Sequence, residues 1–279
     1  MALLADPPRR TADSLDAIAR EVRGTVVRMS YEAKTAHLGS SLSVVDILVA
    51  AYWGALRLDP QAVDALDRDR LILSKGHAAS ALYAVLARWG AFSPMLLDTF
   101  AQAGGWLGEH PTSSTPGIEA STGSLGHGLS LGVGMALAGR IQKRDFRVYV
   151  VLSDGECNEG SVWEAAMMAA AHRLDNMVAI IDYNKWQATD RSNEVMALSP
   201  LREKWHSFGW TAHEVDGHDA AALAHLLRRI PDTSGQPVAI VAHTIKGKGV
   251  SFMEDDNNWH YRVPNANEVE QAFEELGLS

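Results

Sequence analysis

Residues 147–184 read RVYVVLSDGECNEGSVWEAAMMAAAHRLDNMVAIIDYN, in which two β-rich apolar runs enclose a helical segment. We expect strands over residues 147–153 and 177–182, with a helix over residues 161–173 between them. Two consecutive strands joined through a helix pair in parallel, and such strands are buried on both faces. This βαβ unit predicts an α/β fold.

The same alternation of elements continues outward from this unit. Further strands are expected over residues 69–73, 210–215 and 237–244. Helices are expected over residues 14–28, 44–53, 78–89, 126–140, 219–229 and 268–276. The pattern predicts a doubly wound, mainly parallel sheet with helices on both faces. Since no composition shift marks a boundary, we expect one domain over residues 14–279, preceded by an N-terminal arm over residues 1–13.

The overall composition argues against several kinds of partner. The chain has 279 residues, is 47% hydrophobic and carries a formal net charge of −9. Without a basic stripe it is not expected to bind nucleic acid, and its apolar runs are too short to predict a membrane span. The single cysteine, Cys157, excludes an intrachain disulfide framework. Since residues 1–10 also lack a secretory signal, the expected location is cytoplasmic.

Polar residues follow both strands of the central unit. Asp154 and Gly155 come directly after the first strand, and Asn184 lies just past the second. Both strand ends open on the same side of a right-handed βαβ unit, so Asp154 and Asn184 can meet there. Their oxygens suit Mg²⁺, or Ca²⁺, and the N–H groups of Gly155 and Glu156 would face a bound diphosphate. The alternative is that Asp154 and Gly155 only form a turn.

The strings SDGECNEG and IIDYNKWQ resemble the thiamine diphosphate motif, in which Gly-Asp-Gly is followed some thirty residues later by Asn. Ser153 replaces the usual first glycine. The resemblance implies thiamine diphosphate held through a metal ion, with Asp154, Asn184 and the backbone carbonyl of Trp186 as metal ligands. It also implies the thiamine diphosphate-binding fold of the diphosphate-binding, or PP, type. The motif specifies the cofactor and leaves the reaction open.

Four histidines lie in loop-like segments and not on apolar helix faces. They are His37 in TAHLGSSLS, His77 in LSKGHAASALY, His110 in GEHPTSSTPGIEASTG and His260 in FMEDDNNWHYR. A single histidine of this kind is commonly an ordinary surface residue. Four in such contexts are more consistent with a site, because imidazoles donate hydrogen bonds and exchange protons near neutral pH.

In order, and over residues 15–263, these segments resemble transketolase. The resemblance implies that His37 touches the donor and acceptor hydroxyls beside the reacting carbons. His77 and His260 would lie near the cofactor diphosphate and the substrate. His110 would contact the terminal hydroxyl of the donor. The family segment reads His-Pro-Glu where this chain has Glu-His-Pro, so the orientation of His110 is left open.

Two more segments are expected to lie at the cofactor. The string STGSLGHGLS resembles the segment whose backbone holds the aminopyrimidine, which implicates Gly123, Ser124 and Leu125. A glycine-rich helix entry used only for tight packing is the alternative. Ile245 begins the loop IKGKGVSF, residues 245–252, which we expect to form a flap over the cofactor.

Two acidic residues follow the metal motif closely. Glu159 and Glu164 fall five and ten residues after Asp154. They match family carboxylates near the subunit interface and the proton relay. For Glu164, an exposed position on a helix is an equally good reading.

The resemblance covers only the first of the three domains of a full-length transketolase. In the family, the second domain supplies the glutamate that protonates the aminopyrimidine ring of the cofactor. A chain without that domain requires a partner. We therefore expect a second subunit that carries the pyrimidine-binding and C-terminal domains, in an α2β2 assembly.

The activity that the resemblance implies is ketol transfer. A two-carbon unit would move from a ketose, or ketose phosphate, to an aldose. The terminal phosphate or sulfonate of a sugar is bound mainly by the missing domain, so the sequence does not name the sugar. One alternative is the α-type subunit of a thiamine diphosphate-dependent 2-oxo acid dehydrogenase; deoxyxylulose-phosphate synthase fits the chain length less well. A non-catalytic scaffold that retained the fold is the alternative outside the enzymes.

Overall fold

Five parallel strands form the centre of the structure, a computed structural model that describes residues 14–278. The strands are β1 (Arg70–Leu73), β2 (Val148–Ser153), β3 (Met177–Tyr183), β4 (Thr211–Asp216) and β5 (Val238–His243). Their order in the sheet is β1-β2-β3-β5-β4, and every neighbouring pair is parallel. The predicted α/β fold is confirmed. The predicted arm over residues 1–13 lies outside the described residues, as does residue 279.

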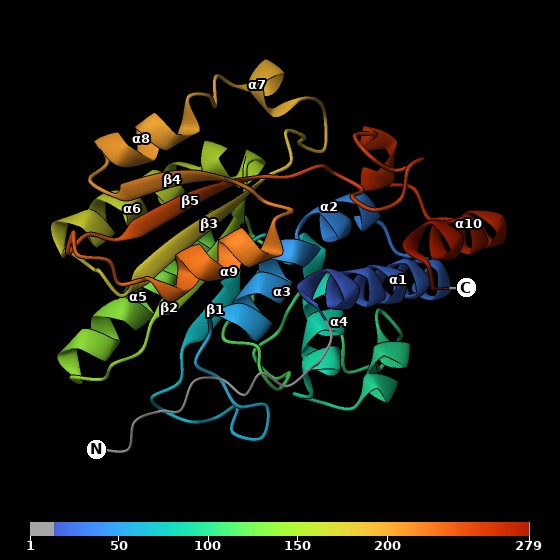
Figure 1. Cartoon of the computed structure of the whole chain (residues 1–279), viewed down its shortest axis with the longest axis horizontal. Coiled ribbons are helices and arrows are strands. Elements are labelled where there is room, and N and C mark those ends of the chain that lie inside the picture. The colour runs from blue at the N-terminus through green and yellow to red at the C-terminus, as the bar shows by residue number, and fades with distance from the viewer. Residues whose placement is uncertain (1–13, 279) are drawn as a thin grey trace.

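Helices cover both faces of this sheet (Figure 1). One face carries α1 (Leu15–Ala33), α3 (Val45–Gly54), α4 (Ala79–Trp89), α9 (Ala220–Arg228) and α10 (Ala266–Leu276). The other carries α5 (His127–Ile141), α6 (Gly160–Ala171) and α8 (Leu201–Ser207). Along β2, Tyr149 and Val151 join the first apolar core, while Val150 and Leu152 join the second. This alternation confirms the doubly wound arrangement, because a strand presents successive side chains to opposite faces.

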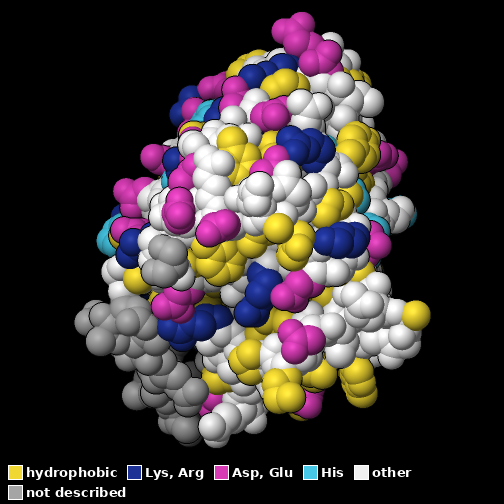
Figure 2. All heavy atoms as spheres, turned by 90° about the vertical axis from the view of Figure 1, so that its right-hand side faces the viewer, with side chains coloured by type: hydrophobic (Ala, Val, Ile, Leu, Met, Phe, Trp, Pro, Cys, Tyr) yellow, Lys and Arg dark blue, Asp and Glu magenta, His cyan; other side chains and the backbone are white. Residues whose placement is uncertain are grey.

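Short helices stand in the loops at the carboxyl edge of the sheet. They are α2 (Leu38–Ser43), α7 (Ser192–Val195) and the 3₁₀ turns η1 (Gly76–Ala78), η3 (Gly155–Asn158) and η4 (Asn257–His260). A further 3₁₀ turn, η2 (Pro94–Thr99), follows α4. Acidic, basic and apolar side chains are intermixed on the side of the molecule where α1 and α10 lie, which is the right-hand side of Figure 1 (Figure 2). Within residues 14–278, no helix combines the length and apolar character that a bilayer crossing requires.

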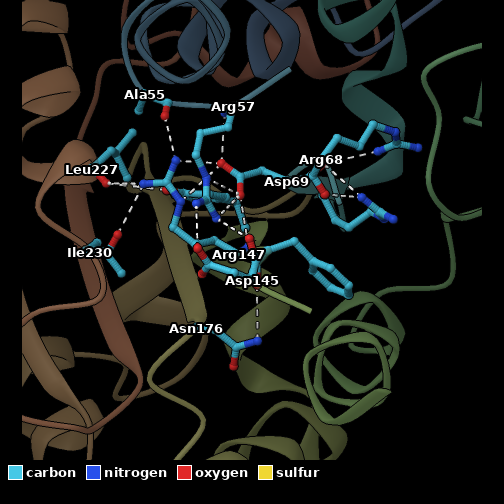
Figure 3. Close-up of polar contacts among 12 residues, drawn as sticks. Ala55, Arg57, Arg68, Asp69, Asp145, Arg147, Asn176, Leu227 and Ile230 are labelled. Carbon is cyan, nitrogen blue, oxygen red and sulfur yellow. Dashed lines mark hydrogen bonds and ion pairs between the residues drawn. The ribbon is translucent and has the colours of Figure 1, made fainter. Parts of the chain in front are cut away.

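The opposite, amino edge of the sheet is tied together by a buried ion network (Figure 3). The Asp69 carboxylate is fully buried and accepts hydrogen bonds from the Arg147 guanidinium at 2.5 and 3.1 Å and from the Arg57 backbone at 2.8 Å. Arg147 also donates to the carbonyls of Ala55 (2.7 Å) and Ile230 (3.1 Å). The network joins β1, β2 and the chain segments after α3 and α9. It lies away from the carboxyl edge, where the polar residues of interest gather.

Candidate active site

Three of the four predicted histidines lie side by side. His37 precedes α2, His77 lies in η1 and His260 ends η4. Their ring centroids are 5.4 Å (His37 to His77), 5.0 Å (His37 to His260) and 5.9 Å (His77 to His260) apart. The His37 N–H also donates to the His260 carbonyl at 2.9 Å. The fold thus brings together residues from the two ends of the chain.

These imidazoles are held neutral. Burial, followed by the positive charges of Lys246 and Lys75 and by His37, lowers the pKa of His260 to about 3. Burial and the nearby Lys75 place the pKa of His77 well below its usual value, and burial with His110 lowers that of His37. A neutral imidazole offers one donor and one acceptor. The cluster can therefore form hydrogen bonds with hydroxyl or phosphate groups.

Two buried lysines stand beside the histidines. Lys75 and Lys246 are 0% exposed. The Lys75 ammonium lies 2.5 Å from the Asp182 carboxylate and donates to the Ser40 carbonyl at 3.0 Å. Lys246 has no carboxylate partner within ion-pair distance among the described residues, and its ammonium contacts only neutral groups, Asn257 at 2.6 Å and His260 at 3.1 Å.

The unpaired charge of Lys246 is costly to bury. Burial and the nearby charge of Lys75 lower the pKa of Lys246 to about 8. An anion beside the Lys246 ammonium would stabilise its charged form. Lys75, the other buried lysine, belongs to the string SKGH. The sequence draws attention to the histidine of this string and gives no role to Lys75, because burial of an ammonium cannot be read from sequence. The position of Lys75, two residues after the end of a buried strand, is the one signal that could have indicated it.

The ends of β2 and β3 meet as expected. The Asp154 carboxylate is fully buried and accepts hydrogen bonds from the backbone N–H of Lys185 and the hydroxyl of Ser192, both at 2.8 Å. Lys185 directly follows Asn184, whose amide oxygen accepts from the Trp186 N–H at 3.1 Å. The proposed ligand groups therefore belong to adjoining segments at one edge of the sheet.

The chemistry of Asp154 fits a metal cation. Among the described residues, all its hydrogen-bond donors are uncharged: Gly155 N–H, Lys185 N–H and Ser192 hydroxyl. Burial, aided by the negative Asp182, raises the pKa of Asp154 to about 6. A divalent cation would offset this buried charge, and carboxylate, amide and carbonyl oxygens are ligands that Mg²⁺ accepts. Asp154, Asn184 and Trp186 remain the predicted ligands.

The segment after Asp154 uses its polar groups within the chain. The Gly155 N–H donates to the Asp154 carboxylate at 2.9 Å, and the Glu156 N–H donates to the Ser153 hydroxyl at 3.2 Å. A diphosphate contact to either N–H, as the sequence predicts, requires these bonds to be exchanged. The Glu156 side chain is fully buried and accepts from the Gly126 N–H at 2.8 Å. It thereby ties the loop before α5 to the end of β2.

His110 lies against the predicted aminopyrimidine segment. Its ring is so close to Gly123 that a Cβ there would lie 2.6 Å from the imidazole Cδ2. Gly123 has φ 138°, which favours glycine. The backbone of Gly123 also approaches Gly76, the residue before His77. The fourth histidine thus lies on the same edge, beside Ser124 and Leu125, which are exposed and half-buried, respectively.

Ile245 and the loop that follows are anchored. The Ile245 N–H donates to the His218 imidazole at 2.8 Å, and the Gly247 N–H donates to the Gly39 carbonyl at 2.9 Å. Since Lys246 is wholly buried between these two bonds, the expectation of a flap is wrong for this end of the loop. His218 could not be found from the sequence, because its partners come from distant parts of the chain.

Glu159 and Glu164 are exposed and lie outside the histidine cluster. Glu159 packs beside Gly126, where an added Cβ would lie 2.7 Å from the Cβ of Glu159. Within residues 14–278, no hydrogen bond or ion pair links either glutamate to the four histidines. Both side chains are therefore available at the surface of this chain.

The chain is similar to several known proteins over nearly its whole length. The family model described as transketolase, thiamine diphosphate binding domain, matches residues 15–279. An apulose-4-phosphate transketolase subunit of Phocaeicola vulgatus is 42% identical over 264 residues, which are 95% of this chain and 94% of that protein. A 6-deoxy-6-sulfo-D-fructose transketolase subunit of Clostridium sp. is 43% identical over 78% of this chain and 80% of that subunit.

A solved structure agrees with these sequence matches. Campylobacter jejuni transketolase superposes with a TM-score of 0.89 and 28% identity. The aligned part covers 95% of this chain and 43% of that one, so this chain spans less than half of that transketolase. The family model and the superposed structure both cover nearly the whole chain. The chain belongs to the transketolase family and carries its thiamine diphosphate-binding domain.

Proposed function

We propose that this chain is the diphosphate-binding subunit of a two-chain transketolase. The reaction is the transfer of a two-carbon ketol unit from a ketose to an aldose. The observation that carries the proposal is the buried ammonium of Lys246, which has no carboxylate partner within residues 14–278 and lies beside neutral histidines on the sheet edge that also holds Asp154 and Asn184. Such a group of side chains suits an anion bound together with a cation.

The resemblance to transketolase suggests the roles of the side chains. Asp154, Asn184 and the carbonyl of Trp186 would hold Mg²⁺. The backbone of Gly123, Ser124 and Leu125 would hold the pyrimidine ring, and Ile245 would also contact the cofactor. When bound, thiamine diphosphate supplies the carbanion chemistry.

The histidines and the buried lysine complete the proposed site. His77, His260 and Lys246 bind the diphosphate. His37 and His110 bind the hydroxyls of the sugar and assist the movement of protons during the reaction. These assignments agree with the neutral state of the clustered imidazoles, because a neutral ring can donate on one side and accept on the other.

A partner subunit completes the enzyme in this proposal. Two relatives that match most of this chain are named as transketolase subunits. The exposed glutamates lie on or beside α6, which also exposes Met167 and Met168 at 53% and 45%. Exposed methionines beside acidic groups are suited to burial against another subunit. We propose an α2β2 complex with a chain that carries the pyrimidine-binding and C-terminal domains, located in the cytoplasm.

The proposed donor class is a ketose with a terminal anion. One relative is named for a sugar phosphate and another for a sulfonated sugar. Both names describe ketoses that differ in their terminal groups. The chemistry at the transferred carbons is the same for both, and His37 and His110 would serve it.

An activity assay of this chain together with its proposed partner subunit tests this function. The two chains together, with thiamine diphosphate and Mg²⁺, should cleave a ketose phosphate or sulfonate and pass the two-carbon unit to an aldose phosphate. Each chain alone should be inactive, and Asp154→Asn in this chain should abolish the activity of the pair. Decarboxylation of pyruvate with transfer to lipoamide, in place of ketol transfer, would identify the dehydrogenase alternative.

A further inference from the structure

A histidine outside the imidazole cluster holds the backbone of the loop after β5. His218 lies in the turn after β4, and its Nε2 accepts a hydrogen bond of 2.8 Å from the Ile245 N–H. Its Nδ1 lies 2.6 Å from Oδ2 of Asp46 on α3. A backbone N–H can only donate, and a carboxylate can only accept. The His218 ring therefore carries its proton on Nδ1 and is neutral.

Asp46 is fixed as the acceptor in this arrangement. Its carboxylate is 4% exposed, and the same Oδ2 also pairs with the guanidinium of Arg23 on α1. Burial alone would raise the pKa of Asp46, but the hydrogen bond from His218, together with the hydrogen bond and positive charge of Arg23, holds it below the usual value. Because the carboxylate stays ionised, it selects one tautomer of His218.

The bond from His218 reaches the proposed cofactor site through one residue. Ile245 precedes Lys246, whose ammonium lies 3.1 Å from the His260 ring. Beyond Lys246, the Gly247 N–H is held by the Gly39 carbonyl at 2.9 Å. On the other side of Ile245, the Thr244 hydroxyl donates a hydrogen bond to Asp182. Ile245 therefore lies between these two anchors. Its own hydrogen bond to His218 fixes the backbone that sets the direction of the Lys246 side chain.

We propose that Asp46 and His218 are positioning residues for cofactor binding. Asp46 sets the tautomer of His218, and His218 holds Ile245 so that the Lys246 ammonium points at the His260 ring. The role rests on the proposed function, because it presumes that Lys246 and the histidine cluster bind a diphosphate. Neither residue touches the histidine cluster, so both act through the loop backbone.

Hydrogen exchange tests the positioning without any need for catalysis. In the two-chain complex without cofactor, His218→Leu should speed exchange of the Ile245 amide by about tenfold, because its acceptor is lost. His218→Gln keeps an amide oxygen near the position of Nε2 and should exchange more slowly than the Leu variant. The amide of Ile180 in β3 serves as the control. Exchange at Ile245 that is unchanged in His218→Leu, or that rises only in step with Ile180, would overturn the proposal.

Asp46 provides a second pair of variants that leaves His218 in place. Asp46→Asn can present its carbonyl oxygen to both Arg23 and His218, so exchange at Ile245 should stay close to that of the wild type. Asp46→Leu has a similar size but no acceptor, and should match His218→Leu. Equal protection of Ile245 in the Asn and Leu variants would show that the carboxylate does not act through His218.

Cofactor affinity then connects the loop with the site. Titration of the complex with thiamine diphosphate and Mg²⁺ should show binding weakened by about tenfold in His218→Leu, with partial recovery in His218→Gln. Faster exchange at Ile245 with unaltered affinity would overturn the positioning role while leaving the proposed function intact. A wild-type complex that binds no cofactor would instead refute the proposed function, and the positioning role with it.

Discussion

Asp154 is a buried carboxylate whose hydrogen-bond donors among the described residues are all uncharged. Its pKa of about 6 lies above the ordinary 3.8. Below this pKa the folded protein holds a proton on Asp154, and above it an uncompensated charge destabilises the fold. A bound cation would remove that penalty at neutral pH. At acid pH the cation would have to displace a proton.

Magnesium with thiamine diphosphate should therefore stabilise the complex more at about pH 7.5 than at about pH 5. Thermal unfolding of the two-chain complex, with and without both ligands, measures the difference. Asp154→Asn should lose the magnesium-dependent rise in Tm at both pH values. A rise that is equal at both pH values, or that persists in the variant, would place the metal elsewhere.

Lys246 should make cofactor affinity fall as the pH rises, whereas the stabilisation by magnesium rises with pH. Its pKa of about 8 in the absence of an anion means that the ammonium loses its charge in mildly alkaline solution. Diphosphate binding requires the charge, so affinity should fall by about tenfold per pH unit above about pH 8. Calorimetry across this range should also record proton uptake on binding. Lys246→Met should bind weakly with no such pH dependence, and a parallel slope in the variant would exclude Lys246 as its source.

The sequence predicts some of these residues and misses others for a physical reason. His37, His77 and His260 can be recognised from the sequence because each sits in a distinctive segment. In the structure their rings are adjacent. Lys246 and His218 carry no such signal, because their importance depends on burial and on partners far along the chain. A charged residue in a glycine-rich loop looks exposed until the fold is known.

At the scale of elements, two loops of the site are fastened to each other. Asp255, in the loop before η4, binds the Arg191 guanidinium through both oxygens at 2.6 Å. The Trp186 indole N–H donates to the same carboxylate at 2.8 Å, and Arg191 stacks on the Trp186 ring. The hydrogen bond from Arg191 and, less strongly, that from Trp186 lower the pKa of Asp255. The contact holds the loop that contains the predicted carbonyl ligand.

Asp255→Ala should release this loop more than it destabilises the fold. We expect faster hydrogen exchange over residues 185–192 and cofactor binding weakened severalfold, because the Trp186 carbonyl loses its fixed position. The ion pair is half-exposed, so the Tm should change little. Glu203→Gln, which removes the exposed pair with Arg202, is the matched control. Similar effects in both variants would argue against a specific contact between the loops.

Helix and strand positions can be predicted well where periodicity is long, and less well where packing decides. The helix expected over residues 14–28 continues to Ala33, because Met29 and Ser30 are also buried. Residues 38–43 have the composition of a polar loop but form α2. There Gly39 allows the backbone to approach Lys246, from whose Cγ an added Cβ would lie 3.1 Å. Small polar residues in a buried helix give no hydrophobic period to detect.

For the whole molecule, the amino edge of the sheet should determine stability while the carboxyl edge determines function. Asp69→Ala removes the carboxylate that pairs with Arg147 and Arg57 and leaves two guanidinium groups without it. We expect the loss of about 3 to 5 kcal/mol of unfolding free energy, measured by urea denaturation. Asp67→Ala, which removes the exposed pair with Arg144, should cost less than about 1 kcal/mol. Equal costs would contradict the structural role of the buried network.

The doubly wound sheet could be predicted from one βαβ unit because both of its strands are continuous apolar runs between clear breaks. The strand order could not, since β5 lies between β3 and β4 although it follows both in sequence. That insertion brings the loop of Ile245 and Lys246 next to the ends of β2 and β3. The proposed site is therefore a consequence of topology as well as of local motifs.

The central claim is that one divalent cation joins the diphosphate to the ends of β2 and β3. Anomalous diffraction from crystals of the two-chain complex, grown with thiamine diphosphate and Mn²⁺ in place of Mg²⁺, locates the ion directly. We expect an anomalous peak among the Asp154 carboxylate, the Asn184 amide oxygen and the Trp186 carbonyl. Cofactor density with the metal peak at any other group would contradict it.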